Sequence, residues 1–200
     1  ENKTFEKYLL NQTNFEETLP EKIRNQAILA VKDEYIFDFL GIEEEHSERD
    51  LEQKLIQNIR AFLLELGSDF SFLGNQYKVE LSDKEYFIDL LLFHRKLQSL
   101  VAIELKIGEF LPEYKGKMEF YLNILNDKVK LPHENEAIGI IICKSKDRTI
   151  VEYSLKSSNL PIGISTYSTS EKLPKNYQNL LPSNEELSEK FENYFKNLKD

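Results

Sequence analysis

Hydrophobic residues follow two spacings along this chain, one typical of helices and one typical of strands. Apolar residues recur at helical spacing through residues 20–40, and Gly41 directly after them suits a helix C-cap. A second helix is expected to begin near Ser47 or Asp50 and to end at Leu66. Strands are expected at 70–73, 77–81, 86–94, 100–106, 137–143 and 161–167, and further helices at 112–126, 148–157 and 183–198. This order predicts an α/β fold with a mixed central sheet flanked by helices.

Two consecutive strand patterns contain charged residues where a buried strand should have none. Residues 86–94 include Asp89, and residues 100–106 include Glu104 and Lys106. Burying a charge is costly unless it is paired or bound to a metal. A short turn at 95–98 predicts an antiparallel hairpin in which Asp89 lies opposite Glu104. Lys106 shares the face of Glu104, because side chains alternate faces with period two.

Two carboxylates and one ammonium on one patch of sheet are functional groups that a metal-dependent hydrolase uses. Close carboxylates repel, and a hard divalent cation such as Mg²⁺ or Mn²⁺ relieves the repulsion through oxygen ligands. A neighbouring lysine can orient or help deprotonate a water, or stabilise charge on a phosphate oxygen. Glu-x-Lys occurs four times in the chain, but only Glu104/Lys106 lies in a buried-strand pattern with a carboxylate opposite. The alternative is a structural ion cluster on a half-exposed sheet.

Glu52 is a second candidate, because it shares a helical row with Ile56, Ile59 and Leu63. A carboxylate in an apolar row faces the sheet or sits at its rim, where it could bind a metal directly or through water. The other interpretation is a first-turn glutamate favoured by the helix dipole.

Composition limits the classes of function. The 200 residues carry a net charge of −9, and residues 75–130 hold nine acids and nine bases. Without a strong basic stripe, only modest affinity for nucleic acid is expected. A single cysteine, Cys143, excludes an internal disulfide and fits a reducing compartment. No membrane span or signal peptide is recognisable, so a cytoplasmic location is expected. Because the chain starts at Glu1 and its only methionine is Met118, we expect a fragment that lacks an upstream region.

Several motifs in one order resemble the C-terminal nuclease domain of YhcG-like proteins, within the PD-(D/E)XK superfamily. They include Ile88-Asp89-Leu90 and Ile103-Glu104-Leu105-Lys106. The full set covers residues 51–52, 62–67, 73–76, 88–94, 103–106, 112–118, 121–122 and 138–144, and the resemblance runs from about Phe5 to Pro182. It implies a restriction-endonuclease-like αβββαβ core. It also implies a helical N-terminal domain of the full-length protein, which is not found in this sequence.

The resemblance also implies roles for individual residues. Asp89 and Glu104 would bind Mg²⁺, Lys106 would assist the water, and Glu52 would complete the acidic site. The Leu105 carbonyl would coordinate as well. Ile88 stands where the superfamily's name has proline, which leaves the metal-binding atoms unaffected.

Three further residues are implied on the substrate side. Gln76 could hydrogen-bond a phosphate or a metal-bound water, and Tyr114 and Lys117 could contact the substrate backbone. For Tyr114 a packing role is an equal alternative. Many family members carry glutamine where this chain has Lys117, which leaves the role of this residue open.

These inferences combine into one expectation and one alternative. The expected function is a metal-dependent endonuclease that hydrolyses phosphodiester bonds in DNA. The alternative is a nucleic-acid-binding or assembly module of a DNA-processing or defence complex, with a weak or silent site. The expected organisation is a helical N-terminal extension at 1–45, a nuclease-like domain at 46–182 and a C-terminal helix at 183–200. The long amphipathic terminal helices make a homodimer an option, although packing on their own core explains them equally well.

Overall fold

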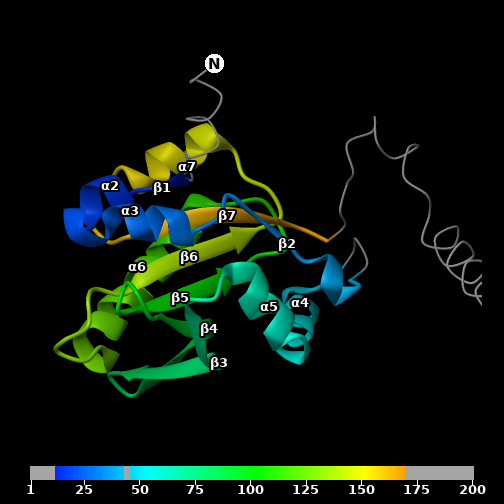
Figure 1. Cartoon of the computed structure of the whole chain (residues 1–200), viewed down its shortest axis with the longest axis horizontal. Coiled ribbons are helices and arrows are strands. Elements are labelled where there is room, and N and C mark those ends of the chain that lie inside the picture. The colour runs from blue at the N-terminus through cyan, green and yellow to red at the C-terminus, as the bar shows by residue number, and fades with distance from the viewer. Residues whose placement is uncertain (1–11, 43–45, 170–200) are drawn as a thin grey trace, which may run out of the picture. The chain divides into compact units, whose positions relative to one another are not determined.

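The described part of the chain forms one mixed β-sheet. The structure is a computed structural model, and it describes residues 12–42 and 46–169. The strand order is β1-β7-β6-β5-β4-β3, and β2 also pairs with β7 (Figure 1). The strands are β1 (Gln12–Thr13), β2 (Glu34–Ile36), β3 (Phe70–Leu81), β4 (Lys84–His94), β5 (Ser99–Leu105), β6 (Ile138–Cys143) and β7 (Ile162–Ser168). The neighbours β5, β6 and β7 are parallel, whereas β3, β4 and β5 form an antiparallel meander.

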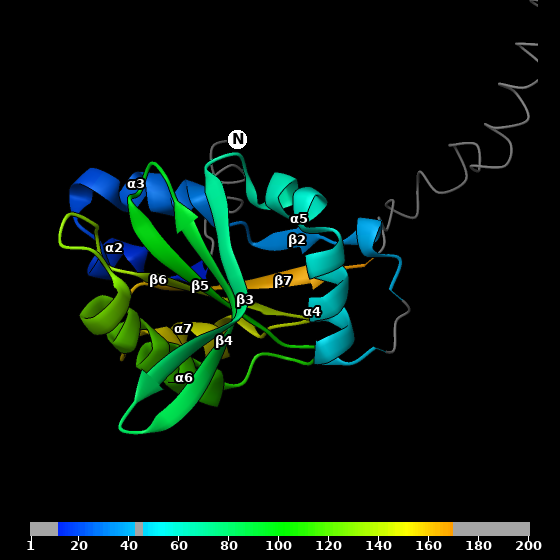
Figure 2. The ribbon, with the colours of Figure 1, turned by 90° about the horizontal axis from the view of Figure 1, so that it is seen from below.

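Helices cover both faces of this sheet, as expected for an α/β fold. Figure 2 shows α3 and α5 on one side of the sheet, and α6 and α7 on the other. The helices are α2 (Phe15–Thr18), α3 (Glu21–Ala30), η1 (Asp38–Leu40), α4 (Glu48–Gln57), α5 (Ile59–Leu66), α6 (Pro112–Ile124), η2 (Leu125–Val129) and α7 (Arg148–Leu155). Each side has its own apolar core, and Leu90, Val101 and Ile103 belong to the one under α3, α4 and α5. Leu91, Leu100 and Ala102 belong to the core under α6 and α7. The predicted order of helix, three strands, helix and strand is confirmed.

The hairpin of β4 and β5 has the predicted register. Leu90 pairs with Ile103 and His94 pairs with Ser99 across an antiparallel ladder. Continued by one residue, this register sets Asp89 opposite Glu104. Between β3 and β4 the register shifts between Phe72 and Gly74, and one strand runs through 70–81, where two strands were expected.

The prediction of one helix over residues 20–40 is wrong beyond Ala30. The helix ends there, and Glu34–Ile36 forms β2 alongside the edge strand β7. The pattern misled because a strand of three residues carries too few positions to show its own period. Residues 12–42 are therefore not a wholly helical extension, since β1 and β2 both join the sheet. The predicted cap at Gly41 has a left-handed backbone with φ of 55°, but it closes η1 rather than a long helix.

The second predicted helix is two helices, α4 and α5, which meet at Asn58. Ser47 begins α4 with a capping box, in which its side chain accepts from the Asp50 amide and Asp50 bonds back to Ser47. The predicted helix at 183–198 lies outside the described residues. Within 12–42 and 46–169, no helix combines the length and the apolar composition needed to cross a membrane.

Candidate metal-dependent active site

A row of polar side chains crosses three adjacent strands, β3, β4 and β5. Asn75 and Tyr77 pair with Leu90 and Ile88, which sets Gln76 opposite Asp89 in β4. The β4–β5 register then sets Asp89 opposite Glu104. Gln76 has a left-handed backbone, with φ of 44°, and such strain in a residue other than glycine is often found at functional sites. The sheet thus aligns three of the predicted site residues on one face, the side covered by α6.

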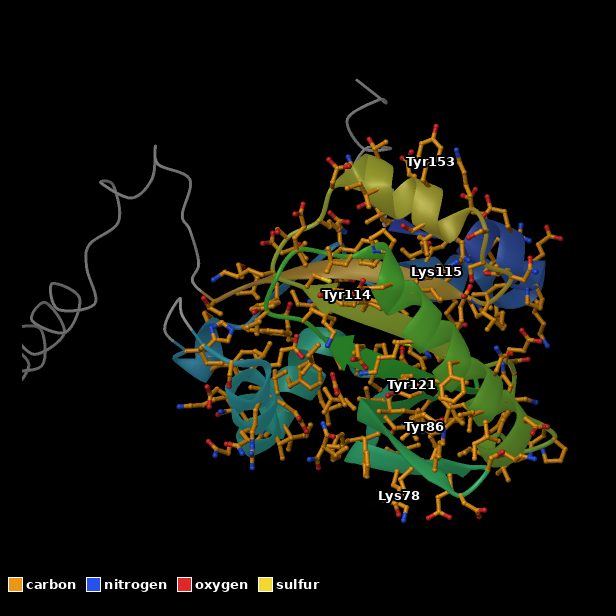
Figure 3. All side chains as sticks on the ribbon, turned by 180° about the vertical axis from the view of Figure 1, so that it is seen from behind. Lys78, Tyr86, Tyr114, Lys115, Tyr121 and Tyr153 are labelled. Carbon is orange, nitrogen blue, oxygen red and sulfur yellow. The ribbon has the colours of Figure 1, made fainter. Side chains whose placement is uncertain are left out.

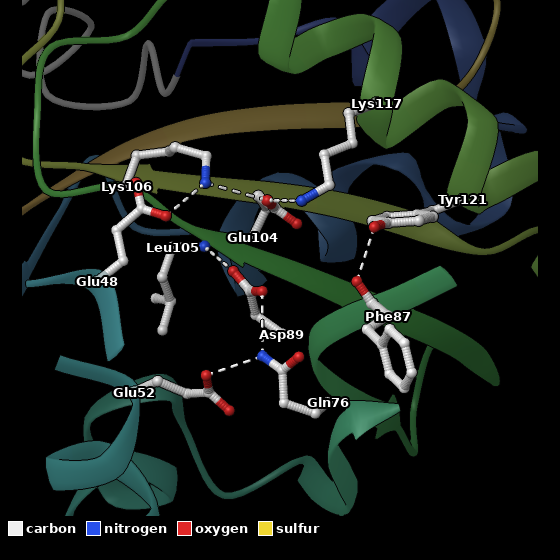
Figure 4. A network of polar contacts seen from close by, with 10 residues as sticks. All are labelled: Glu48, Glu52, Gln76, Phe87, Asp89, Glu104, Leu105, Lys106, Lys117 and Tyr121. Carbon is white, nitrogen blue, oxygen red and sulfur yellow. Dashed lines mark hydrogen bonds and ion pairs between the residues drawn. The ribbon is translucent and has the colours of Figure 1, made fainter. Parts of the chain in front are cut away.

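Glu104 is the most buried charged group of the row, with 1% of the residue exposed. Its Oε1 receives two ammonium groups, one from Lys106 at 3.1 Å and a closer one from Lys117 (Figure 4). Its Oε2 is buried and has no hydrogen-bond partner. A buried carboxylate oxygen without a partner costs free energy, so this atom is where an ion or a donor would be stabilised.

Asp89 is held by the backbone of the neighbouring strand. The Leu105 amide donates to Asp89 Oδ2 at 2.8 Å, and the Gln76 amide nitrogen lies 3.5 Å from Oδ1. Burial, followed by the charge of Glu104, raises the pKa of Asp89 from 3.8 to about 6. Two carboxylates in this arrangement repel each other, and a bound cation would relieve the repulsion.

Lys106 follows β5 and points into the same cluster. Its Nζ lies 2.9 Å from Glu48 Oε2 and over the ring of Tyr114, 5.4 Å from the centroid. Burial opposes its charge, but hydrogen bonds and charges from Glu48 and Glu104 outweigh burial and raise its pKa. The ammonium form of Lys106 is therefore favoured in this arrangement.

Glu52 lies at the rim, one helical turn after Glu48. Its Oε2 accepts from the Gln76 amide at 2.8 Å, and its Oε1 lies 3.4 Å from the Asn75 amide. Gln76 thus bridges Glu52 and Asp89. A groove of about 500 Å³ opens at this point, lined by Glu48, Arg49, Glu52, Gln53, Asn75, Gln76 and Asp89.

The helix α6 closes the other side of the site. Figure 3 shows Tyr114 and Tyr121 along this helix, and Lys117 lies between them in sequence. Lys117 bonds to Glu104 and also lies over the ring of Tyr121, whose hydroxyl donates to the Phe87 carbonyl at 2.7 Å.

The structure brings all eight sequence-derived residues into one neighbourhood. Six of them form two bonded groups: Gln76 joins Glu52 to Asp89, and Glu104 joins Lys106 to Lys117. Leu105 takes part through its backbone amide, and Tyr114 lies beside Lys106. Sequence reasoning missed Glu48. Its signal was available, since a first-turn residue four positions before Glu52 lies on the same face of the helix.

The donor set fits a hard divalent ion. Asp89 and Glu104 offer carboxylate oxygens, which Mg²⁺ and Mn²⁺ prefer, and Glu104 Oε2 has no other partner. Among residues 12–42 and 46–169, no group of three His, Cys, Asp or Glu side chains is arranged to hold a metal. An ion here would therefore draw its remaining ligands from backbone, water or substrate, as Mg²⁺ commonly does.

The mixed sheet, with its carboxylate pair and lysine at adjacent strands, has the arrangement of a PD-(D/E)XK-type nuclease domain. The chain belongs to the YhcG PDDEXK nuclease domain family, whose model matches residues 28–182. The Escherichia coli (strain K12) protein "Putative nuclease YhcG" is 39% identical over 126 residues. That match covers 63% of this chain and 34% of the relative, so the chain spans about a third of the relative's length.

Two solved structures overlap with part of the chain. A repair endonuclease from Pyrococcus abyssi overlaps with a TM-score of 0.41 at 13% identity, over 66% of this chain and 50% of that one. An EndoMS–dsDNA2 complex overlaps with a TM-score of 0.45 at 14% identity, over the same shares. Overlaps this limited carry no information on substrate.

Proposed function

We propose that this domain is an endonuclease that hydrolyses phosphodiester bonds in DNA with the help of Mg²⁺ or Mn²⁺. One observation carries the proposal. The buried Glu104 carboxylate keeps one oxygen without a partner, and the register places Asp89 beside it on the next strand. Membership in a nuclease family supports the same class of reaction.

Asp89 and Glu104 would hold the ion between β4 and β5. A bound divalent ion lowers the pKa of a water and neutralises charge on a phosphate oxygen. The Leu105 amide fixes Asp89, and the carbonyl of the same residue remains a predicted ligand. Gln76 and Glu52 would keep Asp89 in place from the groove side, because the Gln76 amide reaches both carboxylates.

Lys106 would orient the attacking water or help to deprotonate it, and would stabilise charge on the phosphate. In the ion-free site its hydrogen bonds and charges from Glu48 and Glu104 favour the ammonium form. Glu48 would be a positioning residue, since it holds the Lys106 ammonium at 2.9 Å from its own carboxylate. Tyr114 lies beside Lys106 and would contact the sugar–phosphate backbone.

The test is a cleavage assay with the full chain on plasmid, linear duplex, single-stranded and branched DNA and on RNA, with and without Mg²⁺ or Mn²⁺. Glu104→Gln removes one charge from the site without changing its shape. Glu113→Gln is the matched control, because Glu113 belongs to an exposed Glu-x-Lys motif on α6.

Ion-dependent cleavage by the wild type and by Glu113→Gln, with none by Glu104→Gln, would support the proposal. Cleavage of RNA alone would overturn the assignment of DNA. If the wild type and Glu104→Gln bind DNA equally and neither cleaves it, the domain is a binding or assembly module.

A further inference from the structure

Two lysine ammonium groups contact the same carboxylate oxygen, Glu104 Oε1, at the centre of the site. Lys106 and Lys117 both direct their ammonium groups at Glu104 Oε1, and Oε2 of the same carboxylate receives nothing (Figure 4). Lys106 approaches from the end of β5 and Lys117 from the second turn of α6. Asp89 and Glu104 are therefore balanced by two fixed positive charges before any ion binds.

The position of Lys117 is built into the packing of α6. Its ammonium lies over the ring of Tyr121, 5.4 Å from the centroid, and the Tyr121 hydroxyl is tied to the β4 backbone at Phe87. Met118, the next residue, is 1% exposed and packs over Gly139 of β6. Although 44% of the Lys117 side chain is exposed, its ammonium is directed at Glu104 and at the Tyr121 ring.

We propose that Lys117 takes the place of a second metal ion, so that the site binds a single divalent cation at the free side of Glu104. This inference rests on the proposed function and specifies its ion requirement. A second cation near Glu104 would meet the two ammonium groups at short range and would be repelled. The buried, unpartnered Oε2 of Glu104 and the carboxylate of Asp89 on the next strand would attract one ion.

The remaining acidic residues do not supply a second site. Glu52 is engaged by the Gln76 and Asn75 amides, and Glu48 is engaged by Lys106. Among the described residues, no three His, Cys, Asp or Glu side chains are grouped to hold a metal ion. One ion held by two carboxylates thus fits both the free oxygen and the fixed charges.

The test counts bound ions directly, by electron paramagnetic resonance and calorimetry of the full chain titrated with Mn²⁺. Three variants separate charge from shape. Lys117→Met removes the charge at the site, and Lys117→Arg keeps it. Lys115→Met is the matched control on the same helix, because Lys115 pairs with Glu119 and Ser157 and not with the site.

The wild type, Lys117→Arg and Lys115→Met are expected to bind one Mn²⁺. Lys117→Met is expected to bind the first ion about tenfold more tightly or to accept a second one, because a repelling charge within a few ångströms is gone. Two ions in the wild type, or a Lys117→Met variant indistinguishable from Lys115→Met, would overturn this inference and leave the proposed function standing. No Mn²⁺ bound by any variant would instead overturn the proposed function.

Discussion

The charge of Asp89 is expected to lower the stability of the metal-free protein, so removing it should stabilise the fold. Asp89→Asn keeps the shape of the side chain and an oxygen that can accept from the Leu105 amide. It removes the repulsion from Glu104 and the cost of burying a charge. Both effects raise the pKa of Asp89, burial being the larger.

The size of the effect follows from that pKa. A rise from 3.8 to about 6 corresponds to about 3 kcal/mol of unfavourable free energy in the charged form. Water that reaches this half-buried carboxylate screens part of this unfavourable free energy, so we expect Asp89→Asn to raise the free energy of unfolding by about 1–2 kcal/mol. For a domain of this size, such a gain raises Tm by roughly 2–8 °C.

Thermal melts in a chelator across a pH series provide the assay. Well below pH 3.8 the wild-type carboxyl is neutral in both folded and unfolded chains, so the two proteins should melt alike. Between pH 3.8 and about 6 the unfolded chain ionises before the folded one, so the wild type loses stability relative to Asp89→Asn, and the loss is complete above about pH 6. Adding Mg²⁺ should stabilise the wild type only. Glu136→Gln, at an exposed residue outside the site, is the control for the loss of one negative charge. Equal melting of wild type and Asp89→Asn at neutral pH would refute the reasoning.

Three further predictions concern residues in the helices and strands around the site, and thermal melts test all of them. Ser47→Ala should lower the free energy of unfolding by about 1 kcal/mol, because it removes the capping box of α4. Ser47→Thr should keep most of this stabilisation. Gly139→Ala should lower the free energy of unfolding by about 1–3 kcal/mol, because the new Cβ would lie 2.5 Å from Met118 Cγ. Unchanged stability would show that α6 can shift. Tyr121→Phe should cost about 1 kcal/mol through the lost hydrogen bond to the β4 backbone, and Tyr153→Phe, at a side chain left 69% exposed, should cost nothing measurable.

The hairpin that carries the site could be predicted from the sequence because its information is local. The polar break at 95–98 fixes the turn, and the turn fixes which residues face each other. Charged residues within an apolar run then indicate the candidate site, because such burial requires a partner. The strand β2 could not be predicted in the same way. Its partner β7 is more than 100 residues away in the chain, and Glu34–Ile36 is too short to show a period.

Contacts between side chains that lie far apart in the sequence could not be predicted either. The sequence pattern does not distinguish Lys117 from any other lysine on the solvent side of an amphipathic helix. Only the packing of α6 over β5 brings it to Glu104. Glu48 reads like a first-turn acid favoured by the helix dipole, although its carboxylate reaches Lys106. Pairings of this kind depend on the tertiary fold, so a single sequence does not reveal them.

The most direct test of the central claim is anomalous diffraction from Mn²⁺-soaked crystals of the full chain, prepared at an ion concentration that supports cleavage. The account predicts one anomalous peak in contact with the Glu104 carboxylate and Asp89. Peaks only elsewhere on the molecule, in an enzyme that cleaves DNA under the same conditions, would contradict it.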